Sequence, residues 1–182
     1  MLRRMFLSLL SGSGFLLTSG KGVAAVESDQ NNLVGQGYAV LSADDSWLGL
    51  KILGYQFPHE THDPYDSNWL MISGNVGIKG QSWTFTDPCL LTTEAEALAD
   101  WLATLVSGSA TNEDCGFIEP NLYFRRISPD NIRISFSLES RPPWAEKDGT
   151  ETDYGFEVPV TSAFLTVADK LRHQLKIFPT RG

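Results

Sequence analysis

The chain has 182 residues and a formal net charge of −8, with 22 acidic residues against 14 lysines and arginines. This length is that of a single domain that can bury a hydrophobic core of its own. The acidic balance argues against binding to nucleic acid or to an anionic membrane, and it permits a basic partner.

Residues 1–25 resemble a signal for export. They contain basic residues but no acidic one, and their apolar segment is diluted by serine and glycine. The Arg3-Arg4 pair resembles the twin-arginine signal, and small residues precede a possible cut before Val26. The apolar segment is shorter than the ~20 predominantly apolar residues that a transmembrane helix needs. We therefore expect a signal-directed periplasmic protein; a cytoplasmic protein whose true start codon lies further downstream is the alternative.

The folded part is expected to begin after a linker. Residues 26–36 are polar and punctuated by glycine, which predicts a flexible linker. We expect residues 37–182 to form one domain. Its first hairpin is predicted from the alternating apolar segments 38–42 and 47–56, which the turn-forming residues 43–46 separate.

Residues 57–67, which we call the histidine loop, combine turn formers with charge. Their ionisable side chains are His59, Glu60, His62, Asp63 and Asp66. The two histidines lack the spacing of zinc proteases, in which they lie one helical turn apart, and two prolines disfavour a helix here. We expect an exposed polar loop without a metal or cofactor, with a functional metal site as the alternative.

A second hairpin and a helix follow. Residues 69–74 and 83–86 alternate between two faces, and the glycine-rich residues 77–80 between them predict a turn. Asp87 and Pro88 are expected to end the second strand, because proline has no amide hydrogen for the ladder. The spacing of Thr93 and Glu96 predicts a capped helix that ends at Gly108. Its apolar stripe is Leu98, Trp101, Leu102 and Leu105.

The second half of the chain repeats this order. Further strands are predicted at residues 117–118, 122–127, 132–138 and 156–160. A charged, mobile loop is expected at residues 145–153. The last helix, capped by Thr161 or Ser162, should end at Pro179. The order ββββ-α-βββ(β)-α predicts an α+β fold, a mostly antiparallel sheet of seven to eight strands with two amphipathic helices on one face.

No catalytic constellation is recognisable. The sequence has no Gly-x-Ser-x-Gly motif, and His173 lies within an amphipathic helix, so we expect no enzyme, with an unrecognised hydrolase as the alternative. Cys89 and Cys115, the only cysteines, could form one disulfide in an exported protein or remain two buried thiols, and their role is expected to be structural.

Several segments carry a family resemblance. They are Gly54–Pro58, Ser67–Leu70, Ser82–Leu90, Phe136–Trp144 and the final Phe178-Pro179. In this order they resemble segments of the WapI-type bacterial immunity proteins, over roughly residues 37–179. The resemblance implies a protein that binds and neutralises the C-terminal nuclease domain of a cognate contact-dependent toxin, with no enzymatic chemistry or cofactor. The export-like start departs from this pattern, since a nuclease toxin acts in the cytoplasm.

The binding hypotheses differ in the surface that they use. For a basic toxin domain, the expected partner-binding residues are Asp63 and Asp66 in the histidine loop, Asp87 and Glu119 in two acid-proline turns, and Glu139, Arg141 and Trp144 where a strand ends. The alternative function is an exported cell-envelope or small-ligand binding domain without catalysis. Its aromatic surface would comprise Trp47, Trp69, Trp83 and Trp144, although tryptophans in strands more often lie in the core.

Overall fold

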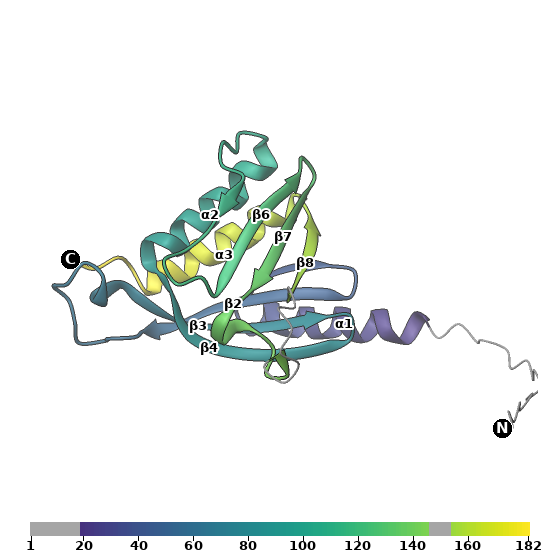
Figure 1. Ribbon diagram of the computed structural model, residues 1–182, viewed down its shortest axis with the longest axis horizontal. Helices are drawn as coiled ribbons and strands as arrows, with labels where there is room; N and C mark the ends of the chain where they lie inside the picture. The colour runs from purple at the N-terminus through teal and green to yellow at the C-terminus, as the bar shows by residue number, and fades with distance from the viewer. Residues whose placement is uncertain (1–18, 146–153) are drawn as a thin grey trace, which may run out of the picture.

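The computed structural model describes residues 19–145 and 154–182, so the loop expected at residues 145–153 lies outside the described residues from residue 146 onward. Figure 1 shows long strands at the base of the molecule and a second set of strands rising beside two helices. The described elements are α1 (Ser19–Gly35), β1 (Ala39–Ala43), β2 (Ser46–Tyr55), η1 (Asp66–Asn68), β3 (Trp69–Ile78), β4 (Gln81–Leu91), α2 (Thr92–Ser107), β5 (Asp114–Cys115), β6 (Leu122–Ser128), β7 (Asn131–Phe136), η2 (Leu138–Ser140), β8 (Tyr154–Pro159) and α3 (Ala163–Ile177). The predicted α+β class and the predicted element order are confirmed, with α1 as an additional helix.

The strands form two sheets instead of one. Within the described residues, sheet A has the order β1-β2-β3-β4 and sheet B the order β5-β6-β7-β8, and every pairing is antiparallel. Each sheet grows by pairing consecutive strands, whereas α2 and the connection after it carry the chain away from β4 before β5 begins. Two four-stranded meanders therefore replace the single sheet that we expected.

The turn between β3 and β4 fixes the register of sheet A. Lys79 and Gly80 both have positive φ angles, of 49° and 82°, which is the conformation that suits the twist of a two-residue hairpin. Further along the same pair of strands, Gly74 lies opposite Phe85, and a Cβ atom on Gly74 would lie 2.0 Å from the Phe85 ring. The glycine is thus required for the close approach of this ring to the strand.

Strand β4 does not end at Asp87-Pro88 as predicted but continues to Leu91. Its pairing with β3 shifts here, since Leu70 is paired with Leu90 whereas Ile72 is paired with Asp87. Such a bulge leaves a residue outside the regular ladder, and β4 is an outer strand of its sheet. A proline is tolerated at this position because it interrupts no central ladder.

Both sheets contribute one face to a shared core with α2 and α3. Leu48 and Leu50 of β2 and Ile132 and Ile134 of β7 are buried in this core, together with Leu98 and Leu102 of α2 and Phe164 and Leu171 of α3. The buried Gln174 of α3 accepts a hydrogen bond from the Ile52 amide at 2.6 Å and donates to the Leu50 carbonyl at 3.4 Å. This amide side chain fixes α3 next to the bulge that follows Ile52 in β2.

The helix ends follow their predicted signals in part. Gly108 ends α2 with a φ of 70°, as expected. The start differs, because α2 begins at Thr92 and Glu94, not Glu96, accepts a hydrogen bond from the Leu91 amide at 2.9 Å. For α3, the hydroxyl of Thr161 accepts a hydrogen bond from the Ala163 amide at 3.3 Å. No helix among the described residues is long and apolar enough to cross a membrane.

Most of the expected linker, residues 26–36, is helical. Helix α1 extends to Gly35, and its buried Leu33 packs against Tyr38 and Gly49 on the face of sheet A opposite the core. The Leu33 carbonyl accepts a hydrogen bond from the Tyr38 amide at 3.0 Å. One apolar contact and a hydrogen-bonded helix end therefore order a segment that composition alone assigns to a linker.

Candidate functional site

Three of the predicted partner-binding residues come together at one place, which we call the acidic corner. It comprises the carboxyl groups of Asp87, Glu119 and Glu139 around Asn121. The Asn121 side chain is almost completely buried, with 1% exposed, and its Nδ2 atom lies 3.3 Å from Asp87 Oδ1 and 3.3 Å from Glu139 Oε2. Asp87 belongs to β4 rather than to a turn, Glu119 lies before β6, and Glu139 lies in η2.

The charges of the acidic corner are only partly compensated. Burial, followed by the charges of Glu139 and Glu119, raises the pKa of Asp87 above its ordinary value. A single amide group donates to two of the three carboxylates, while the Arg141 guanidinium donates to the Leu138 carbonyl at 3.4 Å. A cationic group from another molecule would relieve this like-charge repulsion.

A groove extends from the acidic corner along the outer edge of sheet A. It has a volume of about 310 Å³, and Glu139 and Arg141 line it with residues 84–86 and 142–143. Leu138 also lines this groove, where its side chain is exposed and its φ is +50°. Backbone strain of this kind in a residue other than glycine occurs often at functional sites.

Trp144 lies apart from these charges. Its half-buried ring makes an edge-to-face contact with Trp83, with ring centroids 5.7 Å apart. Trp83 in turn donates from Nε1 to the Ser140 carbonyl at 2.9 Å. The structure therefore places Trp144 against the core, and its contact with a partner stays a prediction.

In the histidine loop, the carboxylates organise the backbone. Glu60 Oε1 accepts hydrogen bonds from the amides of His62, Thr61 and Asp63 at 2.8, 2.9 and 3.2 Å, and these bonds lower the pKa of Glu60. Asp63 Oδ1 accepts hydrogen bonds from the amides of Asp66 and Tyr65, each at 2.8 Å, and the pKa of Asp63 is lowered for the same reason. These two carboxylates stabilise the conformation of their own loop. The Asp66 carboxylate, in contrast, makes no hydrogen bond or ion pair with another described residue.

The last residues of the chain contact the histidine loop and its flanking residues. We call residues 178–182 the C-terminal clasp. The Arg181 amide donates to Asn68 Oδ1 and the Arg181 carbonyl accepts from Asn68 Nδ2, both at 2.8 Å. The Arg181 guanidinium lies over the Tyr55 ring, with Cζ 3.3 Å from the ring centroid. It also donates to the carbonyls of Pro58 and Glu60 at 3.2 and 3.1 Å. Figure 1 shows the C-terminus beside this loop.

The histidine loop is not arranged as a metal centre. Among residues 19–145 and 154–182, no group of three or more His, Cys, Asp or Glu side chains could hold a metal ion. His59 and His62 are exposed, and His62 Nδ1 lies 3.1 Å from the hydroxyl of Thr61.

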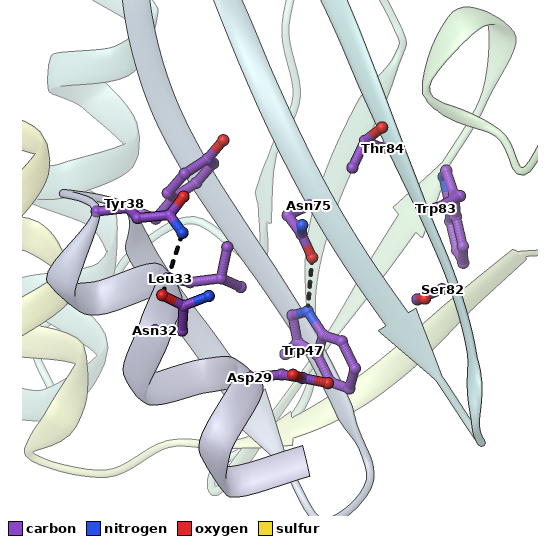
Figure 2. Close-up of a pocket in the computed structure, with 10 residues that line it drawn as sticks. Asp29, Asn32, Leu33, Tyr38, Trp47, Asn75, Ser82, Trp83 and Thr84 are labelled. Carbon is purple, nitrogen blue, oxygen red and sulfur yellow. Dashed lines mark hydrogen bonds between the residues drawn. The ribbon is translucent and has the colours of Figure 1, made fainter. Parts of the chain in front are cut away.

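A pocket of about 360 Å³ lies between α1 and sheet A, on the face away from the core. Figure 2 shows Asp29 and Asn32 of α1 on one side and Asn75 and Thr84 of sheet A on the other. Trp47 Nε1 donates to Asn75 Oδ1 at 3.0 Å. Among the described residues that line the pocket there is no histidine, cysteine or lysine.

The tryptophans do not form one exposed aromatic surface. Trp47 and Trp83 are buried, whereas Trp69 and Trp144 are half-buried. Trp47 and Trp144 lie on opposite faces of sheet A, because Trp47 lies beside α1 and Trp144 packs on Trp83 in the core. This arrangement does not favour the alternative function that depends on a shared tryptophan surface.

Both cysteines are free thiols. Burial raises the pKa of Cys89 to about 12 and that of Cys115 to about 11. Because the thiolate is the reactive form, neither thiol is suited to nucleophilic chemistry near neutral pH.

A comparison with protein families identifies a family that matches most of the chain. The family model described as "Immunity protein WapI-like family" matches residues 40–179. This range includes β2 to α3 with the acidic corner, the groove and the histidine loop, whereas α1 lies outside it. No curated protein matches the chain, and no solved structure matches it either.

Proposed function

The chain belongs to the WapI-like immunity protein family, and from this premise we propose that it binds and neutralises the C-terminal nuclease domain of a cognate contact-dependent toxin. Family membership supports an immunity function with a toxin protein as the partner. The match over residues 40–179 is the observation that carries the proposal. The nuclease class of the toxin is our more specific assignment.

The charge of the protein supports this assignment. A nuclease needs a basic surface to bind the phosphate backbone, and a chain with a net charge of −8 is attracted to such a surface. The acidic corner offers carboxylates whose mutual repulsion is only partly relieved within the protein. Asp66 offers a carboxylate that is not used in folding the histidine loop. Association through such groups should be fast at low salt and slow at high salt.

The test of the proposal needs a cognate toxin, which is to be sought among the genes that neighbour that of this chain. The C-terminal domain of this toxin should arrest growth when it is produced alone and should not do so when this chain is produced with it. The purified chain should block cleavage of plasmid DNA or transfer RNA by the toxin domain. A toxin domain that neither binds the chain nor is inhibited by it would contradict the proposal.

The electrostatic part of the proposal is tested by charge reversal. Asp66→Lys should slow association with the toxin domain, and the defect should shrink as salt rises, because exposed charges are screened beyond ~8 Å at physiological ionic strength. Asp130→Lys, in the exposed turn between β6 and β7, is the matched control. Asp63→Lys is less suitable, because the Asp63 carboxylate accepts two backbone hydrogen bonds. Equal association rates of both variants at every salt concentration would refute steering by Asp66.

We further propose that the chain has no enzymatic activity of its own. The purified protein should not hydrolyse esters, phosphodiesters or glycosides, since neither paired carboxylates at catalytic spacing nor an activated nucleophile was recognised. A turnover that disappears in His59→Ala or His62→Ala would overturn this proposal.

Export through the twin-arginine-like start is also a proposal. A cut before Val26 would fall within α1 and leave its second half, which contains Leu33. Mass spectrometry of the mature N-terminus in the periplasmic and cytoplasmic fractions is the test. A periplasmic chain that begins at Val26 would support export, and an intact Met1 found only in the cytoplasm would contradict it.

A further inference from the structure

The histidine loop carries two exposed aromatic rings. Tyr65 is 59% exposed and Phe57 is 42% exposed, although both belong to residue types that usually bury most of their surface. Aromatic side chains are enriched among the residues that contribute most to protein–protein binding energy. An exposed aromatic pair on a single loop is therefore a candidate anchor for another protein.

The loop that carries these rings is rigidly supported. The Asn68 side chain, which is only 4% exposed, also donates to the Pro64 carbonyl at 3.0 Å and accepts from the Thr92 hydroxyl at 3.0 Å. The Thr180 hydroxyl lies 3.1 Å from that of Thr92. The loop and the C-terminal clasp are thus joined to the first residue of α2. A surface that is ordered before binding loses less conformational entropy when a partner arrives.

Carboxylates predominate in the sequence around Tyr65. Glu60, Asp63 and Asp66 surround Tyr65 in the sequence, and the hydrogen bonds to Glu60 and Asp63 favour their ionised forms. The Arg181 guanidinium beside this loop is engaged by the Tyr55 ring and by the carbonyls of Pro58 and Glu60. The histidine loop therefore offers both carboxylates and exposed aromatic rings, and both kinds of group attract lysine and arginine.

We propose that the histidine loop is the docking surface for basic side chains of the toxin domain, with Tyr65 and Phe57 as its aromatic anchors and Arg181 as the residue that positions it. This inference rests on the proposed function and specifies the surface that serves it. Tyr65 and Phe57 contact the partner directly. Arg181 acts through the loop, because its guanidinium binds the carbonyls of residues 57, 58 and 60.

The first test measures binding of the purified toxin domain to Tyr65→Ala. The dissociation constant should rise by ~10-fold or more, mainly through faster dissociation, as expected of an anchor residue. Tyr123→Ala is the matched control, because Tyr123 is an exposed tyrosine, 38% exposed, on sheet B. The dissociation constant of the Tyr123→Ala variant for the toxin domain should stay within ~2-fold of that of the wild type. The high exposure of Tyr65 allows this variant to fold, and Phe57→Ala provides an independent second variant.

The second test concerns the positioning role of Arg181. In Arg181→Ala, hydrogen exchange at the amides of His62, Asp63 and Asp66 should become faster, while exchange in β7 should not change. Arg181→Lys should not restore the protection, because one ammonium group cannot both stack on Tyr55 and bridge several carbonyls. The effects of Arg181→Ala and Tyr65→Ala on toxin binding should be less than additive, since a misplaced loop already loses the anchor.

The outcomes separate this inference from the function on which it rests. If the wild type binds the toxin domain but Tyr65→Ala and Phe57→Ala bind as tightly as Tyr123→Ala, the docking surface lies elsewhere and the immunity function stands. Strictly additive effects of Arg181→Ala and Tyr65→Ala would remove the positioning role. If the wild type does not bind the toxin domain, the proposed function fails and the inference fails with it.

Discussion

The histidine loop and the acidic corner are both rich in carboxylates, yet they use these groups in opposite ways. In the histidine loop, Glu60 and Asp63 accept five backbone hydrogen bonds between them, and their pKa values are lowered. In the acidic corner, one buried amide donates to two carboxylates, and the pKa of Asp87 is raised. The first arrangement stabilises negative charge, and the second concentrates it at a cost to folding.

The difference shows that a count of acidic residues does not reveal which of them can bind a partner. A carboxylate that accepts backbone amides is a structural element, and its replacement changes the shape of the loop. A carboxylate whose charge is uncompensated can gain a cationic partner without losing a bond within its own chain. Asp66 and the acidic corner belong to this second group, and the following predictions test the distinction.

The largest effect on stability is expected at Asn68, which joins the histidine loop to the C-terminal clasp. Asn68→Ala should lower the free energy of unfolding by ~3 kcal/mol, because the buried Thr92 hydroxyl, the Arg181 amide and the Pro64 carbonyl would lose their hydrogen-bond partner. Urea unfolding followed by circular dichroism measures this change. Asn112→Ala, whose side chain is exposed, is the control and should change stability by less than ~0.5 kcal/mol. Equal stabilities of the two variants would contradict the structural role of the clasp.

The next effect is expected in the acidic corner. Asn121→Asp should lower the free energy of unfolding by ~2 kcal/mol at pH 7, because a carboxylate would replace the amide that separates Asp87 from Glu139. The loss should decrease as the pH falls and the carboxyl groups take up protons. Asn112→Asp provides the matched control for adding a charge. A loss that stays constant between pH 7 and pH 4 would indicate a packing defect instead of charge repulsion.

The contrast between the two regions can also be measured through pH dependence. The folded pKa of Glu60 is lowered from its ordinary value of 4.5, so its contribution to stability is present above that value and is lost as the pH falls through the folded pKa. The folded pKa of Asp87 is raised from 3.8. At a pH between 3.8 and this raised pKa, the carboxyl group keeps its proton in the native state and has released it in the unfolded chain. For Asp87, stability is therefore present below 3.8 and is lost as the pH rises through the raised pKa.

Two neutral variants should consequently act with opposite signs. Glu60→Gln should lower the melting temperature at pH 7, whereas Asp87→Asn should raise it by about 1 °C, a small value because solvent screens a half-exposed carboxylate. The Asp87→Asn difference should vanish near pH 3, below both the unfolded and the raised folded pKa of Asp87, and the Glu60→Gln difference should shrink as the pH falls through the lowered folded pKa of Glu60. Differential scanning calorimetry at several pH values is the measurement. Changes of the same sign at pH 7 would abolish the distinction between the two regions.

The smallest effect is expected at Cys89, which lies two residues from Asp87. Burial is the main reason for the raised pKa of Cys89, and the charge of Asp87 is secondary. Asp87→Asn should therefore change the reaction rate of this thiol with a disulfide reagent by less than ~3-fold, since the fold still excludes the reagent. In the wild type, the half-buried Cys115 should react first. A Cys89 that reacts first would show that the strand around Pro88 opens readily.

The fold could be predicted where local signals determine structure. The order of strands and helices follows from alternation, from turn residues such as Lys79-Gly80 and from the helix stop at Gly108. The division into two sheets could not be predicted, because pairing between distant strands leaves no local pattern. The continuation of β4 past Pro88 was missed for a related reason, since the tolerance of an outer strand for proline appears only when the strand order is known.

The residues of the candidate surfaces could be predicted from the sequence, but their positions in space could not. Asp87, Glu119 and Glu139 are 52 positions apart at most, and only the buried Asn121 and the meeting of the two sheets bring them together. Asp63 is predicted from the sequence as a partner-binding residue, and the structure adds that its carboxylate accepts two backbone hydrogen bonds within its own loop, a use that its Asp-Pro-Tyr-Asp sequence permits. Arg181 was missed entirely, because its partners lie more than 110 positions earlier in the chain.

Trp83 can report when the two sheets come together during folding. Its bond to Ser140 joins positions 57 residues apart, and its ring lies 5.5 Å from that of Phe136 at the end of β7. Contacts of such long sequence separation form only after much of the chain entropy has been lost, so they belong to the late stages of folding. The fluorescence of Trp83 should therefore change when the two sheets meet, after the hairpins have formed. In a stopped-flow experiment, Trp83→Phe should weaken this late signal and leave the earlier signals of tryptophans that do not contact Trp83, such as Trp47, in place.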